Sequence, residues 1–147
     1  MKNVNAVEVL LVEDSMDDAE LTIHALKKQH LANNLIHLKD GAEALDFLFG
    51  RGEFKERDLS NIPKVILLDL KMPKVGGLEV LEKIKSNEQT RKIPVVVLTS
   101  SKQDPDIKKC YELGANSYIV KPVDFNGFLK AISDIGFYWL LLNQPPA

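Results

Sequence analysis

The chain has little cysteine, no long apolar run and no cluster of positive charge, and each shortage excludes a class of protein. Its single cysteine, Cys110, cannot form a disulfide within the chain, which predicts a reducing, cytoplasmic setting. Its apolar runs fall far short of the roughly 20 residues of a membrane-spanning helix, so no membrane association is expected. Its net charge is −2 without a basic cluster, so no nucleic-acid partner is expected either.

The chain also lacks internal repeats, low-complexity segments and a recognisable linker. Its 147 residues suit one domain, 1–147, with a core over about residues 7–140. The N-terminal apolar run is short, interrupted by Glu8 and followed by two acids, which is unlike a signal peptide. We therefore expect a single domain with no second domain after the last helix.

Short β-branched runs alternate with longer amphipathic segments along the whole chain. This alternation predicts an α/β fold, a doubly wound and mostly parallel sheet of five strands with five helices. In the flavodoxin-like order 2-1-3-4-5, the first and third strands are neighbours. The predicted strands are 7–12, 34–38, 64–68, 94–99 and 117–120, and the predicted helices are 15–30, 41–49, 77–87, 104–113 and 124–142.

Local signals agree with these boundaries. Ser15 followed by Asp18 predicts a capping box at the start of the first helix. Asp104 before a proline predicts an N-cap for the fourth helix. The long polar connection 50–63 is expected to be functional or mobile rather than part of the core.

Polar groups follow the apolar runs at the positions where strands are expected to end. Glu13 and Asp14 follow the first run, Asp69 the third, and Thr99 and Lys121 the fourth and fifth. Parallel strands place such groups at one edge of the sheet, where α/β proteins bind ligands. Gathering carboxylates, a hydroxyl and an ammonium is costly unless a cation and an anion bind there.

The chemistry of these groups suits phosphoryl transfer. Mg²⁺ takes oxygen ligands and would relieve the repulsion between neighbouring carboxylates. An ionised Asp69 beside it could act as a nucleophile on phosphorus and form an aspartyl phosphate. The positively charged ammonium of Lys121 would contact one phosphoryl oxygen, and the Thr99 hydroxyl would donate a hydrogen bond to another.

Four motifs, VEDS, LLDLKMPKVGG, VVVLTSS and SYIVKP, resemble in order and spacing those of the receiver domain of two-component response regulators, the CheY-like fold. The resemblance covers residues 7 to about 140 and implies that Asp69 is the phospho-acceptor. It implies that Mg²⁺ is bound by Asp14, Asp69 and the backbone carbonyl of Lys71, with Glu13 helping through water.

The resemblance also implies a conformational switch. Thr99 would move toward the phosphoryl group, and the ring of Tyr118 would swing inward behind it. Lys121 would precede Pro122 across a cis bond. With no output domain, the signal would leave through protein contacts with a downstream target.

The loop 50–63, the DLKMP form and the aromatic segment GFYWLLL are similar to stand-alone regulators paired with cyanobacterial phytochrome kinases. That similarity implies a sensor histidine kinase, such as a bacterial phytochrome, as the phosphoryl donor. Lys71 departs from the polar uncharged residue that this subgroup often carries, although only its carbonyl is needed for the metal. The domain would catalyse only its own phosphorylation and dephosphorylation.

The end of the last helix, extended over residues 137–143, is apolar nearly all round. Such a helix must be buried on every side, whereas the sheet offers one covering surface. We expect a symmetric homodimer in which Phe137, Tyr138, Leu141 and Leu142 lie at the interface. The alternative is that the tail folds back over its own domain.

Two other functions remain open at this point. A Mg²⁺-dependent phosphatase would also pass through an aspartyl phosphate, but no cap domain is evident and the acids after the first strand are spaced differently. A flavodoxin-like binding module would need a phosphate-binding loop rich in Ser, Thr or Gly after the first strand, where this chain has Glu13 and Asp14.

Overall fold

A computed structural model shows one parallel sheet of five strands in the order β2-β1-β3-β4-β5. It describes residues 7–31, 34–72, 74–100, 102–122 and 124–143. The predicted fold class and strand order are therefore confirmed. The strands are β1 (Val9–Val12), β2 (Leu35–Leu38), β3 (Val65–Leu68), β4 (Val95–Thr99) and β5 (Ser117–Val120).

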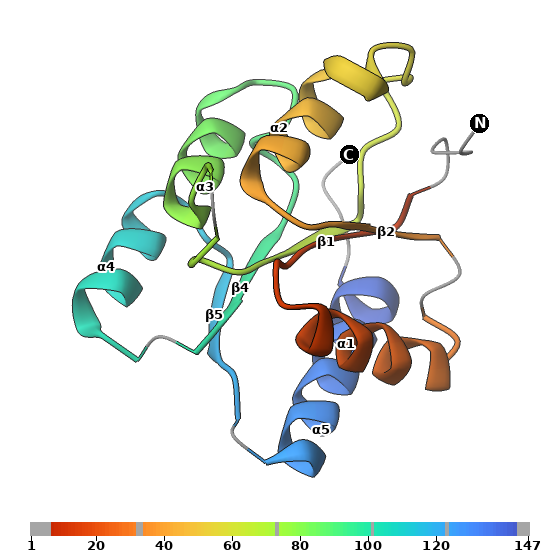
Figure 1. Cartoon of the computed structure of the whole chain (residues 1–147), viewed down its shortest axis with the longest axis vertical. Coiled ribbons are helices and arrows are strands. Elements are labelled where there is room, and N and C mark those ends of the chain that lie inside the picture. Colours follow the sequence, from red (N-terminus) through yellow and green to blue (C-terminus); the bar gives the residue numbers. More distant parts are fainter. Residues whose placement is uncertain (1–6, 32–33, 73, 101, 123, 144–147) are drawn as a thin grey trace.

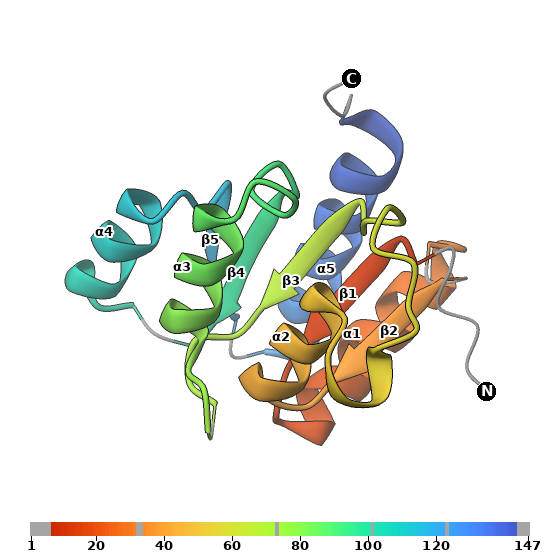
Figure 2. The same ribbon diagram turned by 90° about the horizontal axis from the view of Figure 1, so that it is seen from above.

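The helices cover both faces of the sheet (Figure 1). One face carries α1 and α5, and the other carries α2, α3 and α4. Figure 2 shows α5 behind the sheet, α2 and α3 in front of it, and α4 to the side, next to β5. The helices are α1 (Met16–Lys28), α2 (Gly41–Phe49), α3 (Gly77–Ser86), α4 (Asp104–Glu112) and α5 (Phe125–Gly136), with a short 3-10 turn η1 (Gly52–Phe54) and a π-helical turn η2 (Phe137–Leu142).

The central strands are buried on both faces, which explains their continuous apolar runs. Successive side chains point to opposite faces, so Leu10 and Val12 join the core under α2 and α3. Val9 and Leu11 instead join the core under α1 and α5. The single cysteine, Cys110, is fully buried in the first of these cores and packs as a small apolar residue.

The observed helix boundaries differ from the predicted ones mainly at the caps and at the end of the chain. The fourth helix begins at Asp104 itself, and its N-cap is Gln103, which makes no side-chain capping bond. The prediction that Asp104 caps this helix is therefore wrong. The long C-terminal helix ends at Gly136 and continues as the wider turn η2 rather than as one α-helix to residue 142.

The connection 50–63 is anchored in the core, contrary to the expectation. The buried ring of Phe54 meets the ring of Phe47 edge-on, with centroids 5.2 Å apart. The guanidinium of Arg57 lies 4.1 Å above the same Phe47 ring, and it donates to the carbonyl of Asn61 at 2.6 Å. The polar composition of this segment concealed one aromatic and one arginine that hold it against α2.

The C-terminal turn η2 packs partly on its own domain. Leu140 is buried and Trp139 half-buried against the α1 and α5 core, whereas Tyr138 is 48% exposed. The side chains of Phe137, Leu141 and Leu142 lie outside the described part of the structure. Figure 2 shows the last turns projecting beyond the strands.

Two further findings concern the backbone. All peptide bonds in the described ranges are trans, including that between Lys121 and Pro122, so the expected cis bond is wrong. Within the same ranges, no helix combines the length and apolar character that crossing a membrane requires.

Candidate functional site

Three carboxylates meet where β1 and β3 end. These strands are adjacent, with Val12 opposite Leu68, and the Asp69 N–H donates to the Val12 carbonyl at 3.0 Å. Glu13, Asp14 and Asp69 each place one carboxylate oxygen within 4.8 Å of the others. Glu13 and Asp69 are buried, and Asp14 is exposed. The structure therefore brings together the acids that the sequence placed at separate strand ends.

Lys121 follows β5 and reaches the same place. Its Nζ lies 2.6 Å from Glu13 Oε1, 2.7 Å from Asp18 Oδ2 and 4.0 Å from Asp69 Oδ2. Its side chain is only 9% exposed, so these carboxylates replace most of its water. The Lys121 N–H also donates to the carbonyl of Thr99 at 2.8 Å, which ties the lysine to the end of β4.

The site is partly shielded from water and carries more negative than positive charge. Both features raise the pKa of Glu13. Burial raises the pKa of Glu13 to about 7, and the charge of Asp69 adds to the rise, against the lowering effect of its hydrogen bond to Lys121. Burial alone would lower the pKa of Lys121, but hydrogen bonds to Asp18 and Glu13 outweigh it, and the pKa is raised. The lysine is thus held in its charged form.

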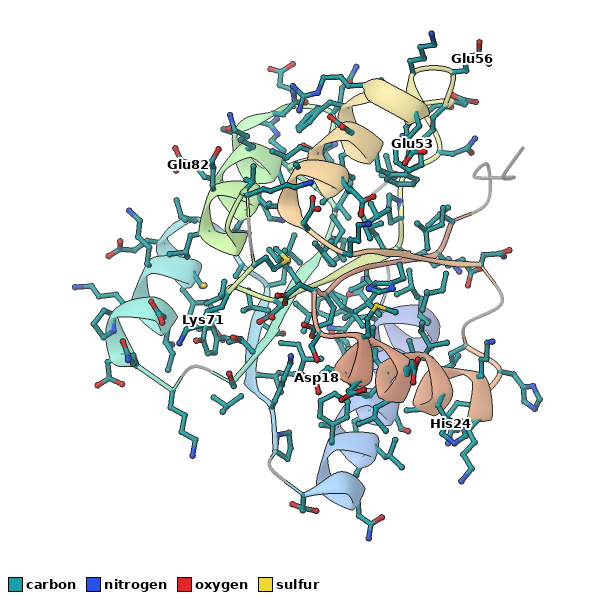
Figure 3. The ribbon with its side chains drawn as sticks, in the orientation of Figure 1. Asp18, His24, Glu53, Glu56, Lys71 and Glu82 are labelled. Atoms are coloured by element: carbon teal, nitrogen blue, oxygen red, sulfur yellow. The ribbon has the colours of Figure 1, made fainter. Side chains whose placement is uncertain are left out.

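The donor set fits a hard divalent cation. One oxygen from each of three carboxylates, gathered within 4.8 Å, offers the ligands that Mg²⁺ or Mn²⁺ prefers. A bound cation would offset the excess negative charge that Lys121 only partly neutralises. Lys71, whose carbonyl is the predicted further ligand, lies in the segment after β3 with its side chain exposed (Figure 3).

Asp69 itself is held in a defined orientation. Its Oδ1 accepts the N–H of Leu70 at 2.8 Å. Behind it the chain turns closely past α3: a Cβ added at Gly77 would lie 2.3 Å from the Asp69 carbonyl oxygen. A glycine at this position lets the loop pass directly beneath the acid.

Thr99 and Tyr118 lie on the neighbouring strands β4 and β5, where Tyr118 is opposite Val97, two residues before Thr99. Thr99 is the last residue of β4 and is fully buried. Tyr118 is half-buried and packs against the core under α2 and α3. Its backbone N–H donates to the hydroxyl of Tyr111 on α4 at 3.2 Å, a contact that the sequence did not reveal.

Two residues at the site were not predicted to be there. The sequence pattern predicts Asp18 only as the partner of Ser15 in a capping box, yet its carboxylate binds Lys121. Ser15 Oγ does accept the Asp18 N–H at 3.3 Å, but the Ser15 N–H donates to Glu13 Oε2 at 3.2 Å, so Glu13 completes the box. His37 Nε2 donates to the Glu13 carbonyl at 2.7 Å, which ties β2 to the end of β1.

Asp18 could have been found from helix geometry. Position 18 lies in the first turn of α1, directly after the strand end that supplies Glu13 and Asp14. Figure 3 shows Asp18 at the start of α1, beside the ends of the strands. The signal was therefore present as an acid one turn beyond the predicted metal ligands.

The sequence of residues 9–133 matches the response regulator receiver domain, and the chain belongs to that family. It is 42% identical over 139 residues to the response regulator Rcp1 of Synechocystis sp., a match that covers 95% of this chain and 92% of Rcp1. The predicted family is thus confirmed.

Solved structures of the same kind superpose on the fold. The crystal structure of the Mn²⁺-bound form of Rcp1 has a TM-score of 0.88 at 40% identity, covering 96% of this chain and 99% of that one. The phosphorylated cyanobacterial phytochrome response regulator RcpA has a TM-score of 0.89 at 34% identity, covering 97% and 99%. The bacteriophytochrome response regulator RtBRR is 52% identical with a TM-score of 0.75, covering 96% and 84%.

Proposed function

We propose that this receiver domain accepts a phosphoryl group on Asp69 from a sensor histidine kinase in a Mg²⁺-dependent reaction. The observation that carries the proposal is the cluster of Glu13, Asp14 and Asp69 with Lys121 beside it. The solved structure of one relative contains Mn²⁺ and that of another is phosphorylated, which supports the same chemistry here.

In the transfer step, a carboxylate oxygen of Asp69 forms a bond to phosphorus. The bond from phosphorus to the histidine nitrogen of the kinase breaks, and its electron pair stays on that nitrogen. The Leu70 N–H holds the Asp69 carboxylate in position. Lys121 supplies a fixed positive charge close to the transferred oxygens. Asp14, Asp69 and the Lys71 carbonyl would hold Mg²⁺, with Glu13 helping through water, and the cation would neutralise charge on the phosphoryl group.

The phosphorylated state would then be communicated through Thr99 and Tyr118. The Thr99 hydroxyl would turn toward the phosphoryl group, and the half-buried ring of Tyr118 would move inward behind it. The ring packs against the core yet is only partly buried, which supports a role in which it moves further inward. The changed surface of α4, β5 and α5 would be the face read by a downstream protein.

The donor we propose is a histidine kinase of the phytochrome type, because the relatives include phytochrome response regulators. We further propose that the chain works as a single receiver domain in the cytoplasm, which suits its free Cys110. Labelling by purified candidate kinases loaded with radioactive phosphate would identify the donor.

The test of Asp69 is direct. Incubation with acetyl phosphate and Mg²⁺ should add one phosphoryl mass to the wild type, measured by intact-protein mass spectrometry. Asp69→Ala or EDTA should abolish the addition, because the nucleophile or the cation is removed. The matched control is Asp134→Ala, an exposed aspartate on α5 paired with Lys130, which should still be labelled. An unlabelled wild type would contradict the proposal.

We also propose a symmetric homodimer formed through the last helix and strand, with η2 at the interface. The supporting observation is Tyr138, which is 48% exposed although it lies in an apolar turn. Tyr138→Asp should shift the protein toward monomer in sedimentation-velocity experiments, because a charge would be buried at the interface. Ile62→Asp, an apolar residue with similar exposure in the loop before β3, is the matched control. A wild type that sediments as a monomer at high micromolar concentration would end this proposal.

A further inference from the structure

Asp18 is an acidic residue at the site to which the proposed reaction assigns no role. Its Oδ2 lies 2.7 Å from Lys121 Nζ, which is nearly the same distance as that between Lys121 and Glu13. It is not among the three carboxylates whose oxygens gather within 4.8 Å. Its contact therefore concerns the lysine and not the cation.

The distances show where Lys121 rests. Its ammonium forms two short hydrogen bonds, to Glu13 and Asp18, and lies 4.0 Å from Asp69. A phosphoryl oxygen attached to Asp69 can accept from this ammonium only if the lysine gives up one of those bonds or shares it. The two carboxylates thus compete with the phosphoryl group for the same donor.

Glu13 and Asp18 differ in how this competition would be resolved. A cation held by Asp14 and Asp69, with Glu13 reaching it through water, would draw the Glu13 carboxylate toward itself and weaken its hold on Lys121. Asp18 stands outside that cluster, so its hold on the lysine would persist after the cation binds. Asp18 is therefore the residue against which the phosphoryl group must compete.

We propose that Asp18 is a positioning residue that holds Lys121 in a resting place, from which a phosphoryl group on Asp69 must withdraw it. This rests on the proposed function, since it assigns a role within the same site. Asp18 belongs to α1, and α1 packs along α5. Release of the lysine when Asp69 is phosphorylated would therefore remove the ion pair between the first turn of α1 and the residue after β5, while the packing of α1 along α5 remains.

The neighbouring acid provides a matched control. Asp17 lies in the same first turn of α1, where it makes the same favourable contribution to the helix dipole. It is exposed, and within the described ranges it forms no ion pair. Asp17→Asn and Asp18→Asn thus remove the same charge from the same turn, but only the second removes the contact with Lys121.

The first measurement is binding of beryllofluoride, a phosphoryl mimic, to the Mg²⁺-loaded protein by calorimetry. Asp18→Asn should tighten binding by about three- to tenfold, the worth of one partly exposed charged hydrogen bond. Asp17→Asn should stay within about twofold of the wild type by the same scale. Asp18→Glu, which keeps a carboxylate in reach of Lys121, should return toward wild-type affinity.

The second measurement needs neither metal nor phosphoryl mimic. In NMR spectra of lysine ammonium groups recorded with EDTA, Lys121 should give a signal protected from exchange with water. Asp18→Asn should weaken or shift this signal, and Asp17→Asn should leave it unchanged. Equal effects of the two variants would show that Asp18 has no special hold on Lys121 and would overturn the inference.

The outcomes separate this inference from the proposed function. A wild type that takes up no phosphoryl group from acetyl phosphate refutes the function, and the role of Asp18 falls with it. A wild type that is labelled, with Asp18→Asn indistinguishable from Asp17→Asn in beryllofluoride affinity, refutes the inference alone. Weaker binding in Asp18→Asn than in Asp17→Asn also refutes it, because Asp18 would then hold Lys121 in its working position.

Discussion

Two lysines, Lys121 and Lys85, are partly buried at opposite ends of the sheet. Lys121 follows the carboxyl end of β5 and is surrounded by carboxylates. Lys85, on α3, lies where β4 and β5 begin and is surrounded by neutral oxygens. Its Nζ donates to the carbonyls of Arg91 at 3.0 Å and Ile93 at 2.7 Å and to the side chain of Asn116 at 3.3 Å.

The difference in surroundings reverses the effect on the pKa. Burial lowers the pKa of Lys85, since its partners carry no charge. The pKa of Lys121 is raised despite its burial, because hydrogen bonds to Asp18 and Glu13 favour the ammonium. One lysine ties together loops whose carbonyls need a donor. Lys121 is surrounded by more carboxylates than its single charge can neutralise. Such an excess of negative charge does not stabilise the fold and therefore indicates a ligand site.

The largest expected effect separates the two lysines by function. Lys121→Met should slow phosphorylation by acetyl phosphate by roughly 100-fold, because a fixed positive charge is lost from the transferred group. Lys85→Met should leave the rate within about twofold, since it lies at the other end of the strands. Labelling time courses with Mg²⁺ would measure both. Equal loss in the two variants would show that the lysine at the site has no direct role.

A smaller effect is expected on the free energy of unfolding, which Lys85 should influence through its hydrogen bonds. Lys85→Met should lower the free energy of unfolding by about 2–3 kcal/mol, because two carbonyls and an amide oxygen lose their shared donor. Urea denaturation of both variants in EDTA would test this. The control is Lys130→Met, whose ion pair with Asp134 is exposed, and its loss should be about 0.5 kcal/mol or less. A Lys85 variant as stable as this control would argue against the structural clamp.

The smallest expected effect concerns the pH dependence that the excess of acid creates. The pKa of Glu13 is about 7 in the folded protein against 4.5 as the ordinary value, so Glu13 favours folding below pH 4.5 relative to higher pH. In EDTA, this contribution should fall as pH rises from 4.5 to 7 and be level above it. We expect roughly 1–2 kcal/mol rather than the full value of the shift, because the charges of Asp69 and Lys121 act on Glu13 in opposite directions.

Glu13→Gln supplies the comparison for that measurement. Subtracting its unfolding free energies from those of the wild type at each pH isolates Glu13 from the other acids. Addition of Mg²⁺ to the wild type should remove the dependence, because a bound cation favours the carboxylate. A stability difference that rises with pH over this interval would contradict the expected sign.

The sequence was sufficient for the sheet and for the acids at its edge because both depend on local pattern. A strand that is buried on both faces reads as an unbroken apolar run, and the residue after it must emerge at the edge. Glu13 and Asp69 directly follow β1 and β3, and Thr99 is the last residue of β4, so the pattern alone predicts their position at the edge. The order of the strands followed from the fold class.

Contacts between side chains of different helices and strands could not be predicted from this local pattern. The bond from Asp18 to Lys121 joins residues 103 positions apart in the chain and depends on how α1 docks against α5. The burial of Arg57 depends on the ring of Phe47, which composition alone cannot reveal. The Asp104 cap failed by one position, within the ordinary uncertainty of helix ends.

The position of Trp139 allows the C-terminal turn η2 to be followed by intrinsic tryptophan fluorescence. It is the only tryptophan in the chain, and it lies in η2, half-buried on the α1 and α5 core with the ring of Tyr138 5.0 Å away. Intrinsic fluorescence excited at the red edge therefore reports from this one turn, without labels or engineered probes. Any stimulus that lifts or docks the end of the chain, whether a partner subunit or a signal from the far edge of the sheet, should register as a change in emission colour.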